Sequence, residues 1–440
     1  MIADLSQQYI SDHPGSNGAP RETFVLNLGP QHPATHGVLR VKLTMDGEYI
    51  LRAEPVPGYI HRMHEKMGEN RTWAQFLPNT SRIDYLSAMT YTHAFVGAVE
   101  RAAKIEVPPR AEYIRVITSE LNRISSHLVW FGAFILDLGG FTPLLYAFDD
   151  REKILDLLEG ITGSRLTYCY YRFGGVCNDI DEPFIEGTRA FIPLMRSRLK
   201  LYHSLVTENI ILRKRLIGIG PISQEMCRKY GATGPVIRGS GVAYDVRKVE
   251  PYSAYSEFDF EVPVYEQGDC MARYLVRMVE IEQSLRIIEQ ALAKLPDGPV
   301  MGKAPARGLK LPPGDCCYAV EAARGRFAVR IVSDNKEIPY RVKLRTPSFS
   351  NLSLFEEASQ GMMIADALAL MGSLDLGTGG SKAEEIYGRI GPGSRVVVYG
   401  DYDVDGVSAT TLAARLFSRR GAGVGYFIPH RHQEGYGLHE

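Results

Sequence analysis

The sequence is organised around one loop, Leu28-Gly-Pro-Gln-His-Pro-Ala-Thr-His-Gly37. This loop lies between two strand-like runs at residues 24–28 and 38–45. Glycine and proline recur along it, which is typical of a fixed loop rather than of a helix or strand. Two imidazoles, His32 and His36, stand in the loop. Histidine titrates near neutrality, so the loop could donate protons to a ligand, although both rings could equally hydrogen-bond the turn itself.

Composition places the chain among globular proteins. Its 440 residues are 45% hydrophobic and 23% charged, and 50 Lys and Arg residues against 51 Asp and Glu residues leave a net charge of −1. This balance does not favour nucleic acid or an anionic membrane as a general partner. The six cysteines include no Cys-x-x-Cys pair, which indicates a reducing, cytosolic compartment.

The sequence carries neither a secretory signal nor a membrane-spanning segment. Residues 1–22 lack the apolar core and cleavage site of a signal peptide, and we expect a flexible leader there. The nearest apolar run, at residues 128–136, is followed by Asp137 and falls well short of the ~20 residues that a transmembrane helix needs. Any link to a membrane is therefore expected to come through a partner.

The periodicity after the loop predicts an α+β fold. Apolar and polar residues alternate over 38–45, and Asp46-Gly47 is a typical two-residue hairpin turn before a returning strand at 49–53. Apolar residues spaced by three and four then run from Ile114 to Ile135, which favours a long helix in an antiparallel bundle. We expect a second hairpin over 317–332, and further helices over 84–104, 149–160, 185–215, 267–295 and 352–371.

The character of the sequence changes at residue 377. Residues 377–394 indicate a glycine-rich linker and a short helix. A strand over 395–400, a helix over 408–420 and a strand over 424–429 would form one βαβ unit, whose parallel strands normally belong to a larger, doubly wound sheet. We therefore predict one domain at 23–376 and a truncated fragment at 395–440, since two strands alone bury too little surface.

Seven motifs follow one another in a fixed order between about residues 23 and 376. They are Gly29-Pro-Gln-His-Pro-Ala-Thr-His-Gly37, Gly58-Tyr-Ile-His-Arg62, Ser81-Arg-Ile-Asp-Tyr-Leu86, Glu120-Leu-Asn-Arg-Ile-Ser-Ser-His127, Tyr171-Arg-Phe-Gly-Gly175, Gly268-Asp-Cys-Met-Ala-Arg-Tyr274 and Arg345-Thr-Pro-Ser-Phe-Ser-Asn-Leu352. Motifs of this length in this order are highly specific. Through them the chain resembles the 49-kDa-type subunit (D-type in bacteria) of NADH:quinone oxidoreductase, respiratory complex I.

The resemblance implies a quinone-reducing chamber. In the family, the second histidine of the loop and the tyrosine of the Arg-x-Asp-Tyr motif hydrogen-bond the quinone headgroup, and these match His36 and Tyr85. The family pairs that histidine with an acidic residue matching Asp137, which would favour the protonated imidazole. Imidazole and phenol can both hydrogen-bond a carbonyl and supply a proton as the quinone is reduced. Without the resemblance, Tyr85 would be interpreted as a core residue at a helix start.

The source of electrons and the partners also follow from the resemblance. The family takes electrons from a 4Fe–4S cluster in the adjacent small subunit, so this chain is expected to bind no cofactor alone, with quinone as its substrate. Arg62 matches an arginine close to that cluster, although its side chain could instead form an ion pair at the surface. His32 and Thr167 complete the set of residues that the resemblance implies for cofactor binding. Many relatives have histidine where Thr167 stands, so we expect a cluster of lower, less pH-dependent potential and a menaquinone acceptor.

The expected partners are the cluster-bearing small subunit, the 30-kDa-type (C-type) subunit and membrane-arm subunits, without nucleic acid. The expected location is the cytoplasmic face of the bacterial inner membrane.

The expected fold resembles that of the nickel–iron hydrogenase large subunit, which holds its metals with two Cys-x-x-Cys pairs. Asp84 and Ser87 stand where the first pair would be, and Pro347-Ser-Phe-Ser350 has serine in place of the second. Such a metal site needs soft thiolate ligands. Hydrogenase activity is therefore excluded, and the vacated pocket is where we expect the quinone to bind.

A second resemblance covers the C-terminal segment. The stretch Tyr399-Gly-Asp-Tyr-Asp-Val-Asp-Gly406 is similar to the first motif of DHH-family phosphoesterases, specifically the bacterial single-strand exonucleases, which implies manganese binding by Asp401, Asp403 and Asp405. The Asp-His-His motif and the other metal-binding acids are missing, so we expect an inactive fragment in a chimera. A natural fusion, an assembly artefact and a recombined reading frame are all open, and artefact or accidental joining is favoured. The alternatives to a complex I subunit are therefore a fragment of a nuclease or phosphoesterase, or a non-catalytic scaffold whose usual C-terminus is replaced.

Overall fold

The computed structural model describes residues 23–30, 38–303, 308–376, 395–399 and 423–427. Two compact units make up the chain, and the smaller one combines residues 57–63 with the C-terminal segment. None of the helices within the described ranges is both long and apolar enough to cross a lipid bilayer. Several predictions concern residues outside the described ranges, namely those for the leader, the linker, the helix at 408–420, His32, His36, Asp401, Asp403 and Asp405.

A three-stranded antiparallel sheet contains the flanks of the histidine loop. Its strands are β1 (Thr23–Leu28), β2 (Arg40–Asp46) and β3 (Tyr49–Val56), in that order across the sheet. Alternate residues of β2 are buried, and Gly47 takes a φ of +57° in the turn that leads to β3. Glycine adopts a positive φ without steric strain, so Gly47 suits the backbone conformation of this turn. The predicted hairpin is confirmed.

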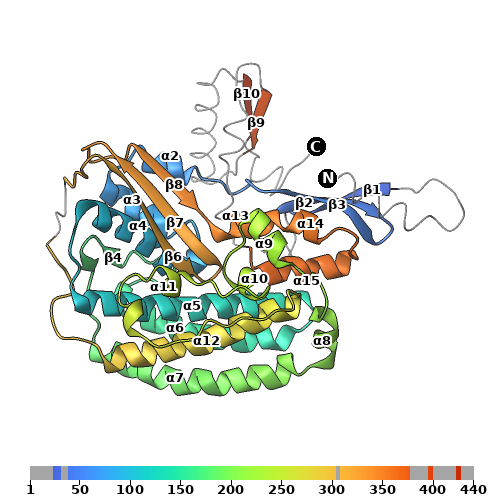
Figure 1. The fold of residues 1–440 in the computed structure, drawn as a ribbon, viewed down its shortest axis with the longest axis horizontal. Coiled ribbons are helices and arrows are strands. Elements are labelled where there is room, and N and C mark those ends of the chain that lie inside the picture. The colour runs from blue at the N-terminus through green and yellow to red at the C-terminus, as the bar shows by residue number, and fades with distance from the viewer. Residues whose placement is uncertain (1–22, 31–37, 304–307, 377–394, 400–422, 428–440) are drawn as a thin grey trace, which may run out of the picture. The chain divides into compact units, whose positions relative to one another are not determined.

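Long helices form a bundle in the lower part of the larger unit as Figure 1 shows it. They are α5 (Pro109–Asp137), α6 (Phe141–Thr162), α7 (Glu182–Tyr202) and α12 (Cys270–Ala293), with α5 packed against both α6 and α12. The apolar seam from Ile114 to Ile135 is buried, as its periodicity predicts. Mixed helices and small antiparallel sheets make this an α+β fold.

Some helix boundaries differ from the predicted ones. The helix expected at 84–104 is α4 (Ala88–Ala103), preceded by a 3-10 turn, η2 (Tyr85–Ser87). The helix expected at 185–215 is broken after α7 by a π-helical turn, η3 (His203–Thr207), before α8 (Ile210–Leu216) begins. The Asn209 side chain accepts hydrogen bonds from the first N–H groups of α8, so a polar cap starts a new helix where the periodicity suggested a continuous one.

A second antiparallel sheet packs against α4. Its strands are β6 (Gly314–Ala322), β7 (Gly325–Ser333) and β8 (Arg341–Arg345), and β6 and β7 form the second predicted hairpin. A Cβ atom on Gly97 of α4 would lie 2.5 Å from the Tyr318 ring, so only glycine allows this helix to approach the sheet so closely.

The remaining elements are short. The helix expected at 352–371 is divided into α13 (Pro347–Ser353), α14 (Phe355–Ala358) and α15 (Ile364–Leu374). The others are α2 (His64–Gly68), α3 (Trp73–Thr80), β4 (Tyr171–Arg172), β5 (Gly175–Val176), α9 (Gln224–Tyr230), α10 (Pro235–Arg238), α11 (Val246–Val249) and η4 (Tyr255–Glu257).

The smaller unit contains two described strands, β9 (Arg395–Tyr399) and β10 (Gly423–Phe427). They pair in parallel, with Arg395 opposite Gly423. Parallel pairing of two strands with these bounds agrees with the expected βαβ pattern. The pairing of these two strands does not by itself test the resemblance of this segment to a phosphoesterase, which stays a prediction.

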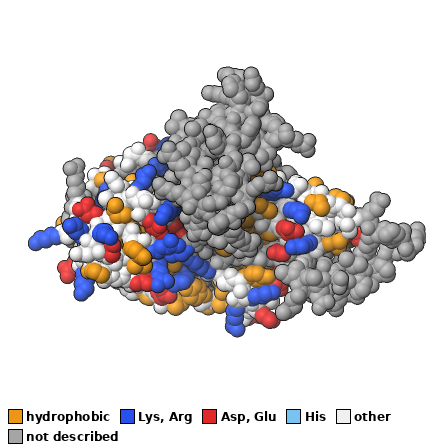
Figure 2. Space-filling model, turned by 90° about the horizontal axis from the view of Figure 1, so that it is seen from above, with side chains coloured by type: hydrophobic (Ala, Val, Ile, Leu, Met, Phe, Trp, Pro, Cys, Tyr) orange, Lys and Arg blue, Asp and Glu red, His pale blue; other side chains and the backbone are white. Residues whose placement is uncertain are grey.

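Charged side chains are not spread evenly over the surface. On the face shown in Figure 2, Lys and Arg side chains gather in one place, with hydrophobic side chains close to them. The net charge of −1 therefore describes the whole chain but not its local surfaces.

Candidate functional site

Tyr85 lies on a turn that is held from two sides. The Asp84 carboxylate accepts a hydrogen bond from the Leu86 N–H at 3.2 Å and so caps η2. From α5, the Asn122 amide donates to the Leu86 carbonyl at 3.1 Å and accepts from the Met89 N–H at 3.1 Å. The Tyr85 side chain is nevertheless 47% exposed. A fixed backbone thus presents an accessible phenol, whereas a purely structural tyrosine would have its ring in the core.

A buried arginine joins this turn to Asp375, the residue that follows α15. Arg324 donates to the Asp84 carboxylate at 2.7 Å, and its guanidinium lies 3.1 Å from a carboxylate oxygen of Asp375. Arg324 also donates to the Asp375 backbone carbonyl at 3.1 Å. Burial alone would lower the pKa of Arg324, but the two carboxylates raise it above its ordinary value. Arg324 is therefore a cation that cross-links η2 to the end of α15.

A second arginine extends this buried set of charges. Asp375 follows α15 in the left-handed conformation with a φ of +53°, and Arg277 of α12 lies 3.9 Å from its other carboxylate oxygen. The Arg277 guanidinium also lies 4.2 Å above the centre of the Trp130 ring. Burial lowers the pKa of Arg277 to about 10, so it remains charged at neutral pH.

Asp137 approaches the same end of α15. It is the last residue of α5 and is half-buried. A Cβ atom on Gly372 would lie 3.7 Å from its carboxylate oxygen and 2.7 Å from the Phe134 ring, so a missing side chain lets α15 pack closely here. The Trp130 indole N–H donates to the Gly372 carbonyl at 2.8 Å and fixes this contact. Tyr85 and Asp137 thus stand on two elements that both attach to the end of α15.

Thr167 and Arg62, the two residues in the described ranges that we expect to face the cluster, belong to different units. Thr167 is half-buried, and its carbonyl accepts a hydrogen bond from the Ser81 hydroxyl at 3.4 Å. Its φ of +51° is uncommon for a β-branched residue, whereas Asn, Asp and His adopt this region more readily. Arg62 is exposed and belongs to the smaller unit.

A second buried set of charges surrounds Glu120 of α5. Glu120 accepts hydrogen bonds from Tyr255 and Ser284, both at 2.6 Å, and pairs with Arg123 and Arg247 at 3.1 Å. Burial alone would raise the pKa of Glu120, but the two guanidinium groups lower it to about 2. These contacts tie α5 to α12 and to the segment around η4.

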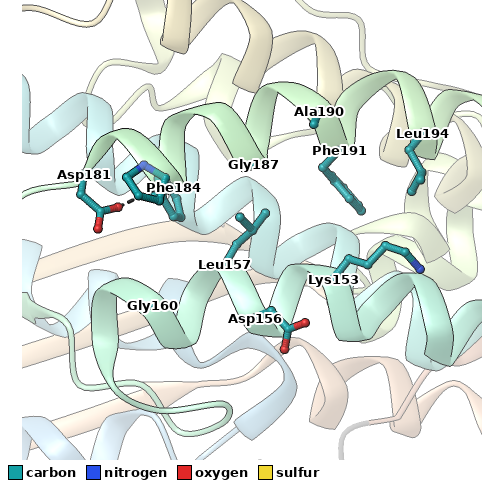
Figure 3. A pocket seen from close by; sticks show the side chains of 11 residues that line it. Lys153, Asp156, Leu157, Gly160, Asp181, Phe184, Gly187, Ala190, Phe191 and Leu194 are labelled. Carbon is teal, nitrogen blue, oxygen red and sulfur yellow. Dashed lines mark hydrogen bonds between the residues drawn. The ribbon is translucent and has the colours of Figure 1, made fainter.

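A hollow on the larger unit lies away from these residues. It has a volume of about 420 Å³ and lies between α6 and α7, where Leu157, Phe184 and Phe191 line it (Figure 3). None of the predicted site residues belongs to its lining. Chemically, it offers a mostly apolar wall with Asp156 and Lys153 at the rim, and it does not coincide with the candidate quinone site.

Arg324, Asp375 and Arg277 were not singled out by the sequence. The signal they leave in it is weak: Arg324 stands in the turn of a hairpin that also carries Glu321 and Arg326, and Asp375 follows an apolar helix. Asp84 and Arg324 are 240 residues apart in the chain, so no local pattern predicts that they form a pair.

Comparison with known proteins identifies the family. The family model of the respiratory-chain NADH dehydrogenase 49 Kd subunit matches residues 137–308 and 303–381. The second D-type subunit of the NADH-quinone oxidoreductase of Opitutus terrae is 72% identical over 358 residues, which cover 81% of this chain and 90% of the relative. The D-type subunit of Desulfotalea psychrophila is 72% identical over 357 residues (81% and 96%), and that of Geobacillus thermodenitrificans is 51% identical over 356 residues (81% and 97%).

The same comparisons correct one expectation. They give no support to the expected chimera or to the nuclease alternative, because the similarities they report concern a single oxidoreductase family. The resemblance rested on the acidic motif at 399–406 and on two short stretches after it, at 408–411 and 429–437, and motif matches of this kind are hypotheses. The chain belongs to the family of the 49 kDa subunit of the respiratory-chain NADH dehydrogenase.

Proposed function

We propose that this chain is the quinone-binding subunit of the peripheral arm of a proton-translocating NADH:quinone oxidoreductase. The observation that carries the proposal is the Tyr85 turn, which presents an exposed phenol while Asp84 and Arg324 hold its backbone. The relatives named as D-type subunits of NADH-quinone oxidoreductase support the same role. A 4Fe–4S cluster in a neighbouring subunit would supply the electrons.

The chain contributes hydrogen bonds and protons to the reaction. Reduction of a quinone to a quinol takes up two electrons and two protons. As negative charge develops on the quinone oxygens, the Tyr85 phenol donates a hydrogen bond and then its proton to one oxygen, and His36 does the same for the other. Asp137 pairs with His36 and favours its protonated form. Water then returns a proton to each group.

The finer assignments follow from the same role. Arg62, His32 and Thr167 face the cluster-bearing small subunit, and the chain also assembles with the 30-kDa-type subunit and the membrane arm at the cytoplasmic face of the bacterial inner membrane. Threonine at position 167 supplies no titrating side chain, so the cluster has a lower and less pH-dependent potential, suited to menaquinone.

Quinone reductase activity of the assembled complex tests this function. We expect Tyr85→Phe and His36→Ala each to lower the turnover number by about a hundredfold, because each removes a proton donor. Tyr340→Phe is the matched control, since Tyr340 is 70% exposed and outside the site. The assignment is wrong if both substitutions leave activity at the level of this control while the complex assembles normally.

A further inference from the structure

A short helix exposes an unusual amount of aliphatic surface. Ile210 and Ile211 at the start of α8 are 70% and 69% exposed, and Ile217 just after it is 51% exposed. On a helical wheel, Ile210, Lys214 and Ile217 are spaced by four and three and share one face. Leu212 and Leu216 occupy the opposite face and are buried. The outward face of α8 is therefore aliphatic and cationic, and no residue needed for the core lies on it.

This face has a fixed geometry. Asn209 caps α8 with hydrogen bonds to the N–H groups of Ile211 and Leu212 at 2.9 and 3.3 Å. The Arg215 guanidinium donates to the Ala365 carbonyl at 2.9 Å and so ties α8 to α15. The exposed isoleucines thus stand on an anchored helix, and their exposure is a property of the fold.

Two of the three basic residues of α8 are available for an external partner. Arg213 and Lys214 are exposed, and neither has a carboxylate partner among the residues that the structure describes. Two other surface arginines are neutralised, since Arg165 contacts three carboxylates on α6 and Arg196 contacts two on α12. Two unneutralised cations beside exposed isoleucines fit an anionic, partly apolar surface.

A second group of exposed apolar side chains lies at the same end of the bundle. Phe141, Leu145 and Phe148 are spaced by four and three along the start of α6 and are 60%, 55% and 39% exposed. The Arg198 guanidinium of α7 lies 5.8 Å from the centre of the Tyr146 ring, and α7 leads through η3 directly to α8. We call the exposed faces of α6 (141–148) and α8 (210–217) the end surface.

We infer that the end surface rests on the headgroup region of an anionic lipid bilayer. Isoleucine and phenylalanine side chains would enter the boundary between headgroups and acyl chains, while Arg213 and Lys214 would contact lipid phosphates. The core of a protein interface is instead depleted in lysine, whereas Lys214 stands between the two isoleucines of the outward face. This inference does not depend on the quinone site, because it uses none of the residues placed there.

Vesicle binding by the full chain tests the inference. Sedimentation with vesicles of phosphatidylcholine, with and without phosphatidylglycerol, gives the partition coefficient in each lipid. We expect tighter binding to the anionic vesicles, and we expect Arg213→Ser/Lys214→Ser to weaken it about 25-fold, since each basic residue near the surface contributes about fivefold. Ile210→Ser/Ile211→Ser is expected to weaken binding to both kinds of vesicle by at least roughly tenfold.

Matched variants separate this from nonspecific adsorption. Arg189→Ser/Lys200→Ser removes two exposed basic residues of α7, and Val249→Ser removes an aliphatic side chain that is 55% exposed. Both are expected to bind like the unchanged chain. The inference is overturned if the control variants lose as much binding as the α8 variants, or if the chain binds neither kind of vesicle. It is also overturned if the α8 variants bind vesicles normally but fail to assemble into the complex, because the end surface would then be a protein interface.

Discussion

Arg324 lies 2.7 Å from the carboxylate of Asp84, the residue immediately before Tyr85. Both side chains are buried, and the arginine is also paired with Asp375. One cation therefore neutralises two acids and holds the turn that carries the exposed phenol. The position of the candidate quinone ligand depends on a residue that the family motifs of the sequence did not point to.

Removing this cation should destabilise the fold. Arg324→Gln leaves the buried Asp84 without a counter-charge and leaves Asp375 with only Arg277, at 3.9 Å. Breaking a buried pair in this way costs about 3–5 kcal/mol. Urea unfolding followed by the fluorescence of the buried Trp73 and Trp130 measures the change. Arg330→Gln is the control, because Arg330 and its partner Asp315 are exposed and such pairs add little. Equal midpoints for the two variants would show that Arg324 does not hold the turn.

The stability of the fold should fall in acid through Glu120. Its pKa is lowered to about 2 from an ordinary value of 4.5, so the ionised group stabilises the folded state above pH 4.5. This contribution is lost as the pH falls from about 4.5 to about 2. In Glu120→Gln, the free energy of unfolding should be lower at neutral pH and should change less steeply across that range. The exposed Glu186→Gln variant should keep the original pH dependence, and a Glu120→Gln profile parallel to it would contradict the prediction.

Two glycine substitutions should have opposite effects. In Gly372→Ala the new methyl group would lie 2.7 Å from the Phe134 ring, so α15 must move away from α5, at a cost of about 1–3 kcal/mol. Gly160→Ala on exposed α6 meets no atom within 4 Å and should stabilise the helix by up to about 1 kcal/mol. Thermal unfolding measures the stability of both variants. A gain in stability from Gly372→Ala would contradict the close packing of α15 against the end of α5 near Asp137.

Position 167 should control the pH dependence of the neighbouring cluster. Thr167→His introduces an imidazole with an ordinary pKa near 6.5 in a backbone conformation that suits histidine. The reduction potential of the cluster in the assembled complex should then change with pH by up to about 59 mV per unit around neutrality. Thr167→Asn suits the same backbone but does not titrate, so its potential should follow that of the unchanged complex. If the reduction potential of the cluster has the same pH dependence in the unchanged complex, in Thr167→His and in Thr167→Asn, Thr167 does not lie beside the cluster.

Local patterns predicted much of the fold. Alternation in β2 and the Asp46-Gly47 turn predicted the first hairpin, and the seam from Ile114 to Ile135 predicted α5, because in both cases the buried face is set by neighbours in the sequence. The break between α7 and α8 was missed because apolar periodicity continues through it. The decisive group there is the single side chain of Asn209, which accepts hydrogen bonds from the first N–H groups of α8, groups that have no acceptor within the helix.

The candidate site was predicted only in part. Family motifs singled out Tyr85 and Asp137, whose role stays a prediction. In the structure Asp137 lies beside Gly372 of α15, and Asp84, next to Tyr85, is linked to Asp375 through Arg324. Arg324 and Asp375 were missed because their roles come from contacts between distant segments, which residue periodicity does not report. His36 lies outside the described residues, so its place opposite Tyr85 stays a prediction.

The pairing of Arg324 with Asp375 also constrains the order of events during synthesis. A ribosome delivers the Tyr85 turn early and the bundle helices next, but the acid that completes this charge set comes only at the end of α15. A nascent chain can therefore assemble its helices long before the turn reaches its final electrostatic environment. Premature termination before residue 375 would release a chain in which Arg324 keeps only one of its two acidic partners, Asp84.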